Sequence, residues 1–457
     1  MGAVAARAVL PARWRPVVRA MSQTGGASLA SGLLSVIAYK ILAVTLGPAQ
    51  VALLATLQQI RQTALTGATL NGQTALIQGA SAVTGSVRRE YLRTVLVLMS
   101  GATCVVASIL CIAPAWIGAF AGLTPELAPM VRWLAPVVVC SSGFVFLAAL
   151  LNVSGSLGLL AAVQLAGPAA MAILMYPVAI AVRVGHLGAL AILLLASAGA
   201  SLAAVFLTRC RIGEWFRGPG DSFSRPAARK FLAVSGSMLL SGLISSAVLL
   251  AVRARILRAE GLAVAGQFDA AWGISMNHVS LVLASLQTYY LPTLVRSANL
   301  RERNLHIAQV LTVAALAGAP LIAVIAAFKP WVLTLFYSSA FEDGSHYLRW
   351  TLLGDYLKIS SWIFSIPMLA TADLRAFLVA DLAAFGTFAA ASAALARTRN
   401  AAESAAIAFV LMYAVHLAIC AAYAWRRQFR PDRRTSLVWT GGLLLVGAVS
   451  AAHWKSP

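Results

Sequence analysis

Long apolar runs separated by short polar segments make up most of the chain from about residue 25 onward. A run of roughly 20 apolar residues is long enough to cross a bilayer as an α-helix. Twelve such runs each predict one membrane-spanning helix, at about 25–46, 50–80, 92–113, 131–151, 159–182, 187–208, 229–252, 262–290, 306–327, 347–370, 374–395 and 403–425. A further apolar stretch at 436–452 is short and rich in glycine. It is either a thirteenth span or a tail at the membrane surface.

The composition agrees with this pattern. The chain is 60% hydrophobic and 11% charged, with a mean hydropathy of +0.83, whereas the surface of a soluble protein needs more polar groups. We therefore expect an all-α polytopic membrane protein. The net charge of +21 does not indicate a nucleic-acid partner, because no basic block is interleaved with aromatic residues.

The positive charges instead predict the topology. Most of the 35 Lys and Arg residues lie in the segments that are cytoplasmic if the N-terminus is cytoplasmic, and such an excess marks the cytoplasmic side. The longest polar interruption, "RCRIGEWFRGPGDSFSRPAARK" from residue 209, falls between the sixth and seventh spans. The expected domains are a cytoplasmic basic tail (1–24), an N-lobe of six helices (25–208), a cytoplasmic inter-lobe loop (209–228), a C-lobe of six helices (229–425) and a basic C-terminal segment with a short apolar stretch (426–457).

The two predicted lobes begin alike. "SGLLSVIAYKILAVTLGPAQ" from Ser31 and "SGLISSAVLLAVRARILRAEG" from Ser241 share a small-residue start, a cationic helix end and a glycine before the second span. An even number of spans in each lobe makes these parallel repeats, and repeats of this kind commonly enclose a substrate site near the middle of the membrane. We therefore expect two six-helix lobes around a central cavity.

No motif of metal, nucleotide or nucleophilic chemistry is present. The five cysteines and six histidines are scattered without the spacing of a metal or redox site,. No glycine-rich phosphate loop, nucleophile elbow or zinc-protease motif occurs. The sequence predicts neither a bound cofactor nor an enzyme.

Charged residues inside the apolar runs are the candidate functional groups, because a charge in the membrane is costly. In the first lobe these are Lys40 and Arg61, and the acids before residue 210 are Glu90 and Glu126, both in predicted loops. The two cations therefore need distant partners, water or an anionic ligand. The second span also has polar residues at helical spacing, which either line a cavity or bond neighbouring helices together: Gln58, Gln62, Thr66, Thr69 and Gln73.

The second lobe carries buried acids instead. Asp355 and Lys358 are three residues apart on one helix, so they either form a structural pair or act directly. Asp269 and Asp381 have no such partner nearby in sequence, and a membrane carboxyl can carry a proton or a sodium ion. Arg253 lies with two further arginines at the outer end of the seventh span. These either extend to the membrane surface or bind phosphate there.

Several segments together resemble the Wzx-like O-antigen and enterobacterial-common-antigen translocases. These are flippases of lipid-linked oligosaccharides in the multidrug/oligosaccharidyl-lipid/polysaccharide exporter superfamily. The segment "LLGDYLKISSWIFSIPMLATADLRAFLVADL" is the most specific, because it combines G-D-x-L-K with an acid in the next helix. The matching segments are "YKILAVTLGPAQVALL" (39–54), "LNG" (70–72), "AAWGIS" (270–275), "YYLPTLVR" (289–296) and the segment just quoted (352–382).

The resemblance implies twelve helices in two bundles around a cavity, in a bacterial cytoplasmic (inner) membrane. It implies flipping of an undecaprenyl-pyrophosphate-linked glycan, with membrane lipid, a polysaccharide polymerase and a chain-length regulator as partners. Position by position it matches Lys40, Arg253, Asp355, Lys358 and Asp381 to the family's charged residues. The chain departs from the family where "NGQTALIQ" replaces a basic and aromatic motif, and where an acid occurs at position 269.

We therefore expect a flippase that works by alternating access, without a cofactor other than a proton or sodium gradient. Lys40, Arg61 and Arg253 are expected to attract the diphosphate. The alternatives are a cation-coupled multidrug exporter of the same superfamily, and an enzymatic or non-transporting member of a polysaccharide assembly complex. Organic cations would need buried acids or aromatic cages, and the predicted outer loops are short for an enzyme of glycan assembly.

Overall fold

The computed structural model describes residues 15–207, 223–297, 299–371 and 373–452. Within these ranges all regular structure is helical, which confirms the predicted all-α class. The elements are α2 (Arg15–Leu46), α3 (Pro48–Ala68), α4 (Gln73–Ser81), α5 (Gly85–Ile112), α6 (Pro114–Phe120), η3 (Ala128–Trp133), α7 (Leu134–Val153), α8 (Leu157–Arg183), α9 (Ala189–Leu207), α10 (Arg225–Arg296), α11 (Leu300–Val313), η5 (Ala314–Gly318), α12 (Ala319–Ala327), α13 (Lys329–Phe336), η6 (Ser339–Gly344), α14 (Ser345–Ala370), α15 (Leu374–Leu395), α16 (Ala401–Arg426) and α17 (Arg433–Ala452).

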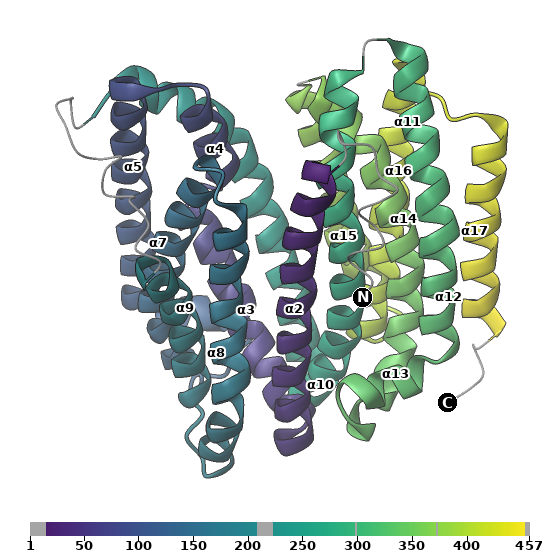
Figure 1. Cartoon of the computed structure of the whole chain (residues 1–457). Coiled ribbons are helices and arrows are strands. Elements are labelled where there is room, and N and C mark those ends of the chain that lie inside the picture. The colour runs from purple at the N-terminus through teal and green to yellow at the C-terminus, as the bar shows by residue number, and fades with distance from the viewer. Residues whose placement is uncertain (1–14, 208–222, 298, 372, 453–457) are drawn as a thin grey trace.

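The helices form two groups. Figure 1 shows α3, α5, α7, α8 and α9 on one side, α11 to α17 on the other, and α2 and α10 between them. Helix α2 packs mainly on α8, and α10 packs on both α3 and α14. Helix α10 therefore joins the two groups, and α10 begins at Arg225, inside the range predicted as the inter-lobe loop.

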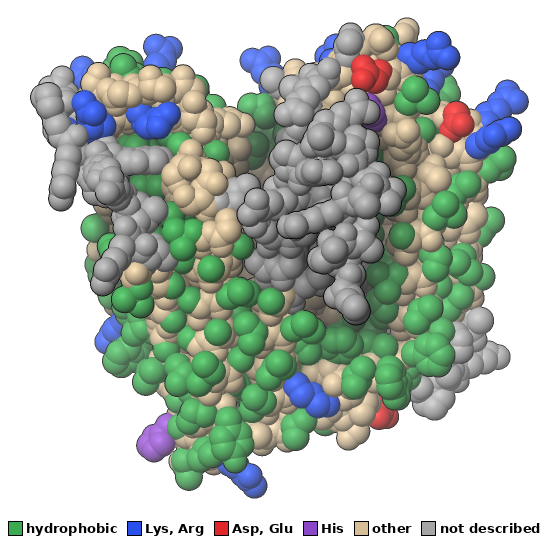
Figure 2. All heavy atoms as spheres, viewed as in Figure 1, with side chains coloured by type: hydrophobic (Ala, Val, Ile, Leu, Met, Phe, Trp, Pro, Cys, Tyr) green, Lys and Arg blue, Asp and Glu red, His purple; other side chains and the backbone are tan. Residues whose placement is uncertain are grey.

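The two ends of the molecule differ in charge. We call the end where α5, α10, α11 and α17 begin the basic end, and the other the opposite end. Figure 2 shows Lys and Arg side chains concentrated along the rim of the basic end and hydrophobic side chains over the middle of this face. Large apolar side chains such as Ile112, Ile173 and Leu437 are more than 70% exposed. A soluble protein does not present such a surface to water, so this belt faces lipid.

Nine helical stretches of the described residues are long and apolar enough to cross a membrane. Helix α10 counts once among them, and α2 counts as a shorter apolar helix. Helices α3 and α14 do not qualify, since polar and charged residues interrupt their apolar windows. The helices that lack a clean apolar window are thus those that carry Lys40, Arg61, Asp355 and Lys358.

A backbone break at Gly261 divides α10 into two spans. This glycine has φ 81° and ψ 177°, non-helical values inside an otherwise continuous helix of 72 residues. Positive φ is accessible to glycine at little cost. The break confirms the predicted separation of the seventh and eighth spans. We call the two parts of the helix α10a (225–260) and α10b (262–296).

The predicted single span at 50–80 is wrong. Helix α3 ends at Ala68, and a turn follows in which Leu70 and Asn71 have positive φ values before α4 begins at Gln73. The Asn71 side-chain amide donates to the Met238 carbonyl of α10a at 2.7 Å, which stabilises this turn against a helix of the distant half of the chain. The Asn71-Gly72 pair is typical of a turn,, so the sequence carries a sign of the break that the long apolar runs on either side obscure.

The apolar stretch at 436–452 forms the helix α17. It packs along α12 and also contacts α11 and α14, and its residues 433–451 are long and apolar enough to cross a membrane. Figure 1 shows α17 running beside α12 at the outer edge of the second group. Of the two alternatives for this stretch, the structure favours the thirteenth span.

Candidate functional site

A polar cluster lies where α2 and α10, the helices between the two groups, contact α3 of the first group. We call it the central polar cluster, and it comprises residues of α2, α3, α10a and α10b. The Tyr39 hydroxyl donates to Gln58 Oε1 at 2.6 Å. Across the break at Gly261, Arg253 Nε donates to Asp269 Oδ1 at 2.8 Å, and the second guanidinium nitrogen Nη2 contacts the same oxygen. The members are Tyr39, Gln58, Gln59, Arg61, Arg253 and Asp269.

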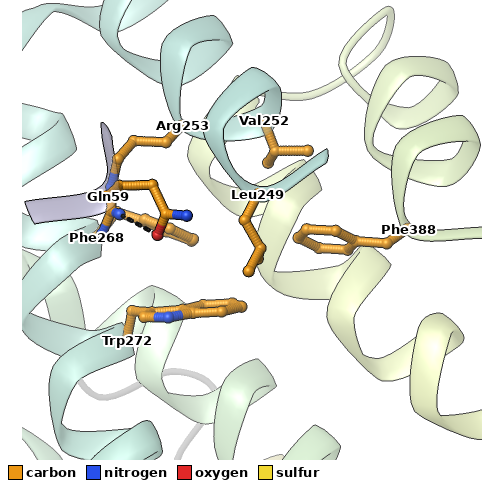
Figure 3. Close-up of a pocket in the computed structure, with 7 residues that line it drawn as sticks. All are labelled: Gln59, Leu249, Val252, Arg253, Phe268, Trp272 and Phe388. Carbon is orange, nitrogen blue, oxygen red and sulfur yellow. Dashed lines mark hydrogen bonds between the residues drawn. The ribbon is translucent and has the colours of Figure 1, made fainter. Parts of the chain in front are cut away.

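Arg253 also reaches the first helix group. Its Nη1 donates to Gln59 Oε1 at 3.5 Å, as drawn in Figure 3. The side chains of Arg253 and Asp269 are 13% and 2% exposed, so the ion pair is largely removed from solvent. Arg255 and Arg258 of the same helix are exposed. Arg255 and Arg258 therefore extend to the surface, which was one of the two alternatives for this group, whereas the Arg253 side chain points inward.

Arg61 is the unbalanced charge of the cluster. Its side chain is half-buried, and its Nε is enclosed without a hydrogen-bond partner. Within the described part of the chain, no hydrogen bond or ion pair engages the Arg61 guanidinium. Since Arg253 and Asp269 neutralise one another, the cluster keeps one net positive charge. A cation in low dielectric without a counter-ion favours an anionic ligand.

A small cavity borders the cluster. It has a volume of about 20 Å³, room for a single water molecule,. Figure 3 shows Gln59 and Arg253 on one side of it, with Leu249, Phe268, Trp272 and Phe388 as the apolar wall. A diphosphate or a sugar would not fit at this size, so the helices would have to separate for a large headgroup to enter.

Lys40 lies outside the cluster, toward the opposite end. Its Nζ donates to the Thr334 carbonyl of α13 at 2.7 Å. The Thr334 hydroxyl in turn donates to Glu342 at 3.0 Å, and the Tyr39 ring meets the Tyr337 ring edge-on at 6.4 Å between centroids. In this conformation Lys40 therefore joins α2 to the second helix group.

The predicted polar stripe divides into three parts. Gln58 belongs to the central polar cluster, and Gln62 is exposed one turn further along α3. Thr66 and Thr69 are buried, and their hydroxyls donate to carbonyls four residues earlier in the same helix at 2.9 and 2.8 Å. Gln73 is exposed on α4, beyond the turn. The structure thus brings Gln58 near Arg61 and leaves the two threonines facing packed helices.

Asp355 and Lys358 have separate partners. Asp355 is fully buried and accepts a hydrogen bond of 2.8 Å from Ser275 of α10b. Lys358 Nζ is 3.2 Å from the Met276 sulfur and lies 5.9 and 5.4 Å from the ring centroids of Phe409 and Tyr413. Each side chain thus contacts another helix, and the two charges also interact electrostatically with each other along α14.

Asp381 has partners on two other helices. Its Oδ2 accepts a 2.7 Å hydrogen bond from Ser241 of α10a. Its Oδ1 is 3.7 Å from His416 Nε2 of α16, and the Cys420 sulfur is 3.7 Å from the same nitrogen. The His416 side chain is 3% exposed. These side chains bring a carboxylate, an imidazole and a hydroxyl together where α10a, α15 and α16 meet.

Three residues of these contacts are not among the sequence candidates: Tyr39, Gln59 and His416. Each meets a partner that is remote in sequence. His416 is a polar residue inside an apolar run, the same signal that identified Asp381, so it was detectable. No group of three His, Cys, Asp or Glu residues able to hold a metal occurs in the described chain.

Comparison by sequence relates the chain to proteins of polysaccharide biosynthesis. Residues 28–346 match the family of polysaccharide biosynthesis proteins. The chain is 28% identical over 162 residues to the lipid III flippases of Escherichia coli (strain K12) and Shigella flexneri, covering 34% of this chain and 38% of theirs. It therefore spans about two fifths of the length of these relatives.

The fold also has close structural counterparts. The lipid II flippase MurJ in an inward closed conformation superposes with a TM-score of 0.73 at 13% identity, covering 94% of this chain and 93% of that one. An inward-facing multidrug resistance MATE transporter of the MOP superfamily gives a TM-score of 0.62 at 14% identity, covering 95% and 100%. At these identities the likeness concerns the fold alone.

Proposed function

This chain belongs to the polysaccharide biosynthesis protein family, within the multidrug/oligosaccharidyl-lipid/polysaccharide exporter superfamily, and we propose that it flips a polyprenyl-diphosphate-linked oligosaccharide. The named activity of its relatives, flipping of lipid III, supports a substrate of this class. We propose an O-antigen or related repeat unit carried on undecaprenyl pyrophosphate, in a bacterial cytoplasmic membrane. A polysaccharide polymerase and a chain-length regulator are its predicted protein partners.

The observation that carries the proposal is the unbalanced cation Arg61 of α3, in the cluster where α3 meets α2 and α10. Arginine matches the geometry of phosphate oxygens, and its charge does not depend on pH in the physiological range. Arg253 can exchange part of its bond to Asp269 for a bond to the diphosphate, while Gln58, Gln59 and Gln62 offer hydrogen bonds to sugar hydroxyls. The polyprenyl tail stays in lipid.

The proposed movement is alternating access by rocking of one helix group against the other. The single-water cavity beside Arg253 implies that the headgroup site forms only when the groups separate. The Lys40 bond to Thr334 would hold the opposite end shut in the present state and break in the other. Resetting would be coupled to a proton or sodium ion at Asp381, with His416 and Ser241 as its partners, while Asp269 and Asp355 are alternative carriers.

The test is a flipping assay in proteoliposomes with a fluorescent polyprenyl-diphosphate sugar. We expect Arg61→Gln to lower the initial rate by roughly tenfold to a hundredfold, the range for loss of one charge-assisted contact. Arg61→Lys keeps the charge but not the paired donors. We expect its flipping rate to lie between those of the unaltered chain and Arg61→Gln. Arg183→Gln is the matched control, because Arg183 is exposed at the end of α8.

The same vesicles test the coupling. An imposed proton or sodium gradient is expected to raise the rate of the unaltered chain, and Asp381→Asn is expected to lose that response. An unchanged flipping rate for Arg61→Gln would contradict the proposed headgroup site. A flipping rate that does not change with either gradient would contradict the proposed ion coupling.

The multidrug exporter is the second candidate of the same fold. Its likeness rests on the fold, and the MATE structures share only 14–16% identity with the chain. An organic cation would need free aromatic faces or unpaired acids. Here Lys358 already lies over Phe409 and Tyr413, and Arg253 already engages Asp269. These contacts favour an anionic substrate.

A further inference from the structure

A second polar site lies away from the central polar cluster, between the beginnings of α11 and α17. It is a groove of about 760 Å³, far larger than the cavity in Figure 3. None of its residues belongs to a helix of the central polar cluster. We call it the α11–α17 groove, and its lining residues are Arg301, Asn304, Leu305, Ala308, Gln309, Thr312, Val313, Arg430, Asp432 and Thr435.

One face of α11 forms most of the wall. Its lining positions recur every three or four residues, as the face of a helix requires,. The face is charged at Arg301 near the basic end and mainly apolar further along, at Leu305, Ala308 and Val313, with Gln309 and Thr312 beside them. A charged opening followed by an apolar channel is the shape that a lipid headgroup and its chain would fill.

The second wall is the segment between α16 and α17. Asn304 fixes it to α11, because its amide donates to the Gln428 carbonyl at 3.0 Å and its Oδ1 accepts from Arg430 N at 3.2 Å. The Arg430 guanidinium lies over the ring of Trp425, 4.1 Å from its centroid. Trp425 is 63% exposed, as is usual for tryptophan at a membrane interface,.

The charge at the opening is positive. Arg301 is exposed and has no described hydrogen bond or ion pair. Asp432 is the one acid of the lining, and its carboxylate accepts from Thr435 N at 3.0 Å, so it serves to cap α17. The neighbouring Arg433 and Arg434 are exposed at the same rim. Arg301 and Arg430 therefore favour a negatively charged headgroup, because the carboxylate of Asp432 is already hydrogen-bonded to Thr435.

We propose that the α11–α17 groove binds an anionic phospholipid of the surrounding membrane. Arg301 and Arg430 bind the headgroup phosphate, Trp425 packs at the glycerol level, and an acyl chain lies against Leu305, Ala308 and Val313. Basic pockets between membrane helices on the cytoplasmic side commonly select anionic lipids in this way. Figure 1 places α17 at the outer edge of the helix bundle, where lipid has direct access.

The test compares lipid retention by the purified full chain in native mass spectrometry. Phosphatidylglycerol and phosphatidylcholine with the same acyl chains are added at equal concentration. We expect the unaltered chain to retain phosphatidylglycerol preferentially, and Arg301→Gln/Arg430→Gln to lower that affinity by about tenfold or more. Arg225→Gln/Arg229→Gln is the matched control, because these two arginines are exposed at the same end on α10a, and it is expected to stay within about twofold.

A second variant tests the apolar half of the site. Ala308→Trp keeps both arginines and fills the channel, so it is expected to reduce retention as well. The proposal is overturned if phosphatidylcholine is retained equally, or if the double variant retains phosphatidylglycerol like the control. It is also overturned if the double variant loses only an added polyprenyl-diphosphate sugar, since the groove would then bind the transported lipid.

Discussion

At the scale of single residues, the buried charges of the second half have polar partners on other helices or across the break in α10. Asp269 bonds Arg253, Asp355 bonds Ser275, and Asp381 bonds Ser241 and lies near His416. A buried charge is stable only with such partners. Arg61 differs, because no described contact compensates it. This contrast, rather than burial alone, distinguishes a structural charge from a ligand-binding one.

The separate partners of Asp355 and Lys358 lead to a prediction. We expect Asp355→Asn and Lys358→Met to destabilise additively, so that the double variant loses about the sum of the two, within roughly 0.5 kcal/mol. Each change removes contacts with α10b or α16, which we expect to outweigh the electrostatic interaction of the two side chains with each other. The measurement is the midpoint of thermal unfolding in detergent, followed by tryptophan fluorescence.

The control is a pair that does bond. Arg253→Gln/Asp269→Asn is expected to be milder than the sum of its single variants, because each single change strands a buried charge at a cost of about 3–5 kcal/mol. If the Asp355/Lys358 double variant were instead more stable than Lys358→Met alone, the two residues would be a pair and the separate assignment would be wrong.

At the scale of elements, α3 and α10b approach each other closely near the opposite end. Gly266 lies so near Pro48 that an added Cβ would overlap the Pro48 carbonyl oxygen, with the Pro48 Cα only 2.9 Å away. Pro48 is the first residue of α3, and its backbone cannot yield without moving that helix. The absence of a side chain at Gly266 therefore permits this close approach of α3 and α10b.

We expect Gly266→Ala to shift the chain toward a state open at the opposite end. The reporter is Gln59→Cys beside the enclosed cavity, labelled with an impermeant maleimide in vesicles of each orientation. Labelling from the opposite end is expected to rise several-fold. Gly236→Ala is the matched control, since Gly236 is on the same helix and a Cβ there meets nothing within 4 Å. Equal labelling of both variants would show that this contact does not hold the end closed.

The sequence predicts some of these elements better than others. Apolar runs predict the helix positions, and a glycine between two such runs predicts the break at Gly261. The turn after α3 has only the Asn71-Gly72 pair as a local signal, and the bond of Asn71 to Met238, on a distant helix, cannot be read from the sequence. The ion pair of Arg253 with Asp269 and the contact of His416 with Asp381 were missed for the same reason. Hydrophobic pattern specifies where helices are, whereas their packing decides which polar groups meet.

At the scale of the whole molecule, the charge distribution and the helix count together determine where the C-terminus lies. The long helices from α2 to α16 alternate in direction, with α10 crossing twice and α11 and α12 together crossing once. Helix α16 returns the chain to the basic end, where Arg426 and Arg427 are exposed. Helix α17 then runs the length of α12 away from that end. If α17 spans the membrane, the two ends of the described chain lie on opposite sides.

Fusions to a fluorescent protein test this topology. The reporter matures in the cytoplasm but not after export through the general secretory pathway. We expect a fusion after Gln428 to fluoresce, because the positive-inside rule predicts that the basic end faces the cytoplasm. A fusion after Ala451 is expected to be dark, while alkaline phosphatase at the same site is active. Fluorescence at both sites would make α17 a helix on the cytoplasmic surface. That location is unfavourable for Leu437 and Leu444, which are 73% and 67% exposed on α17, because water would then surround side chains that a membrane span exposes to lipid.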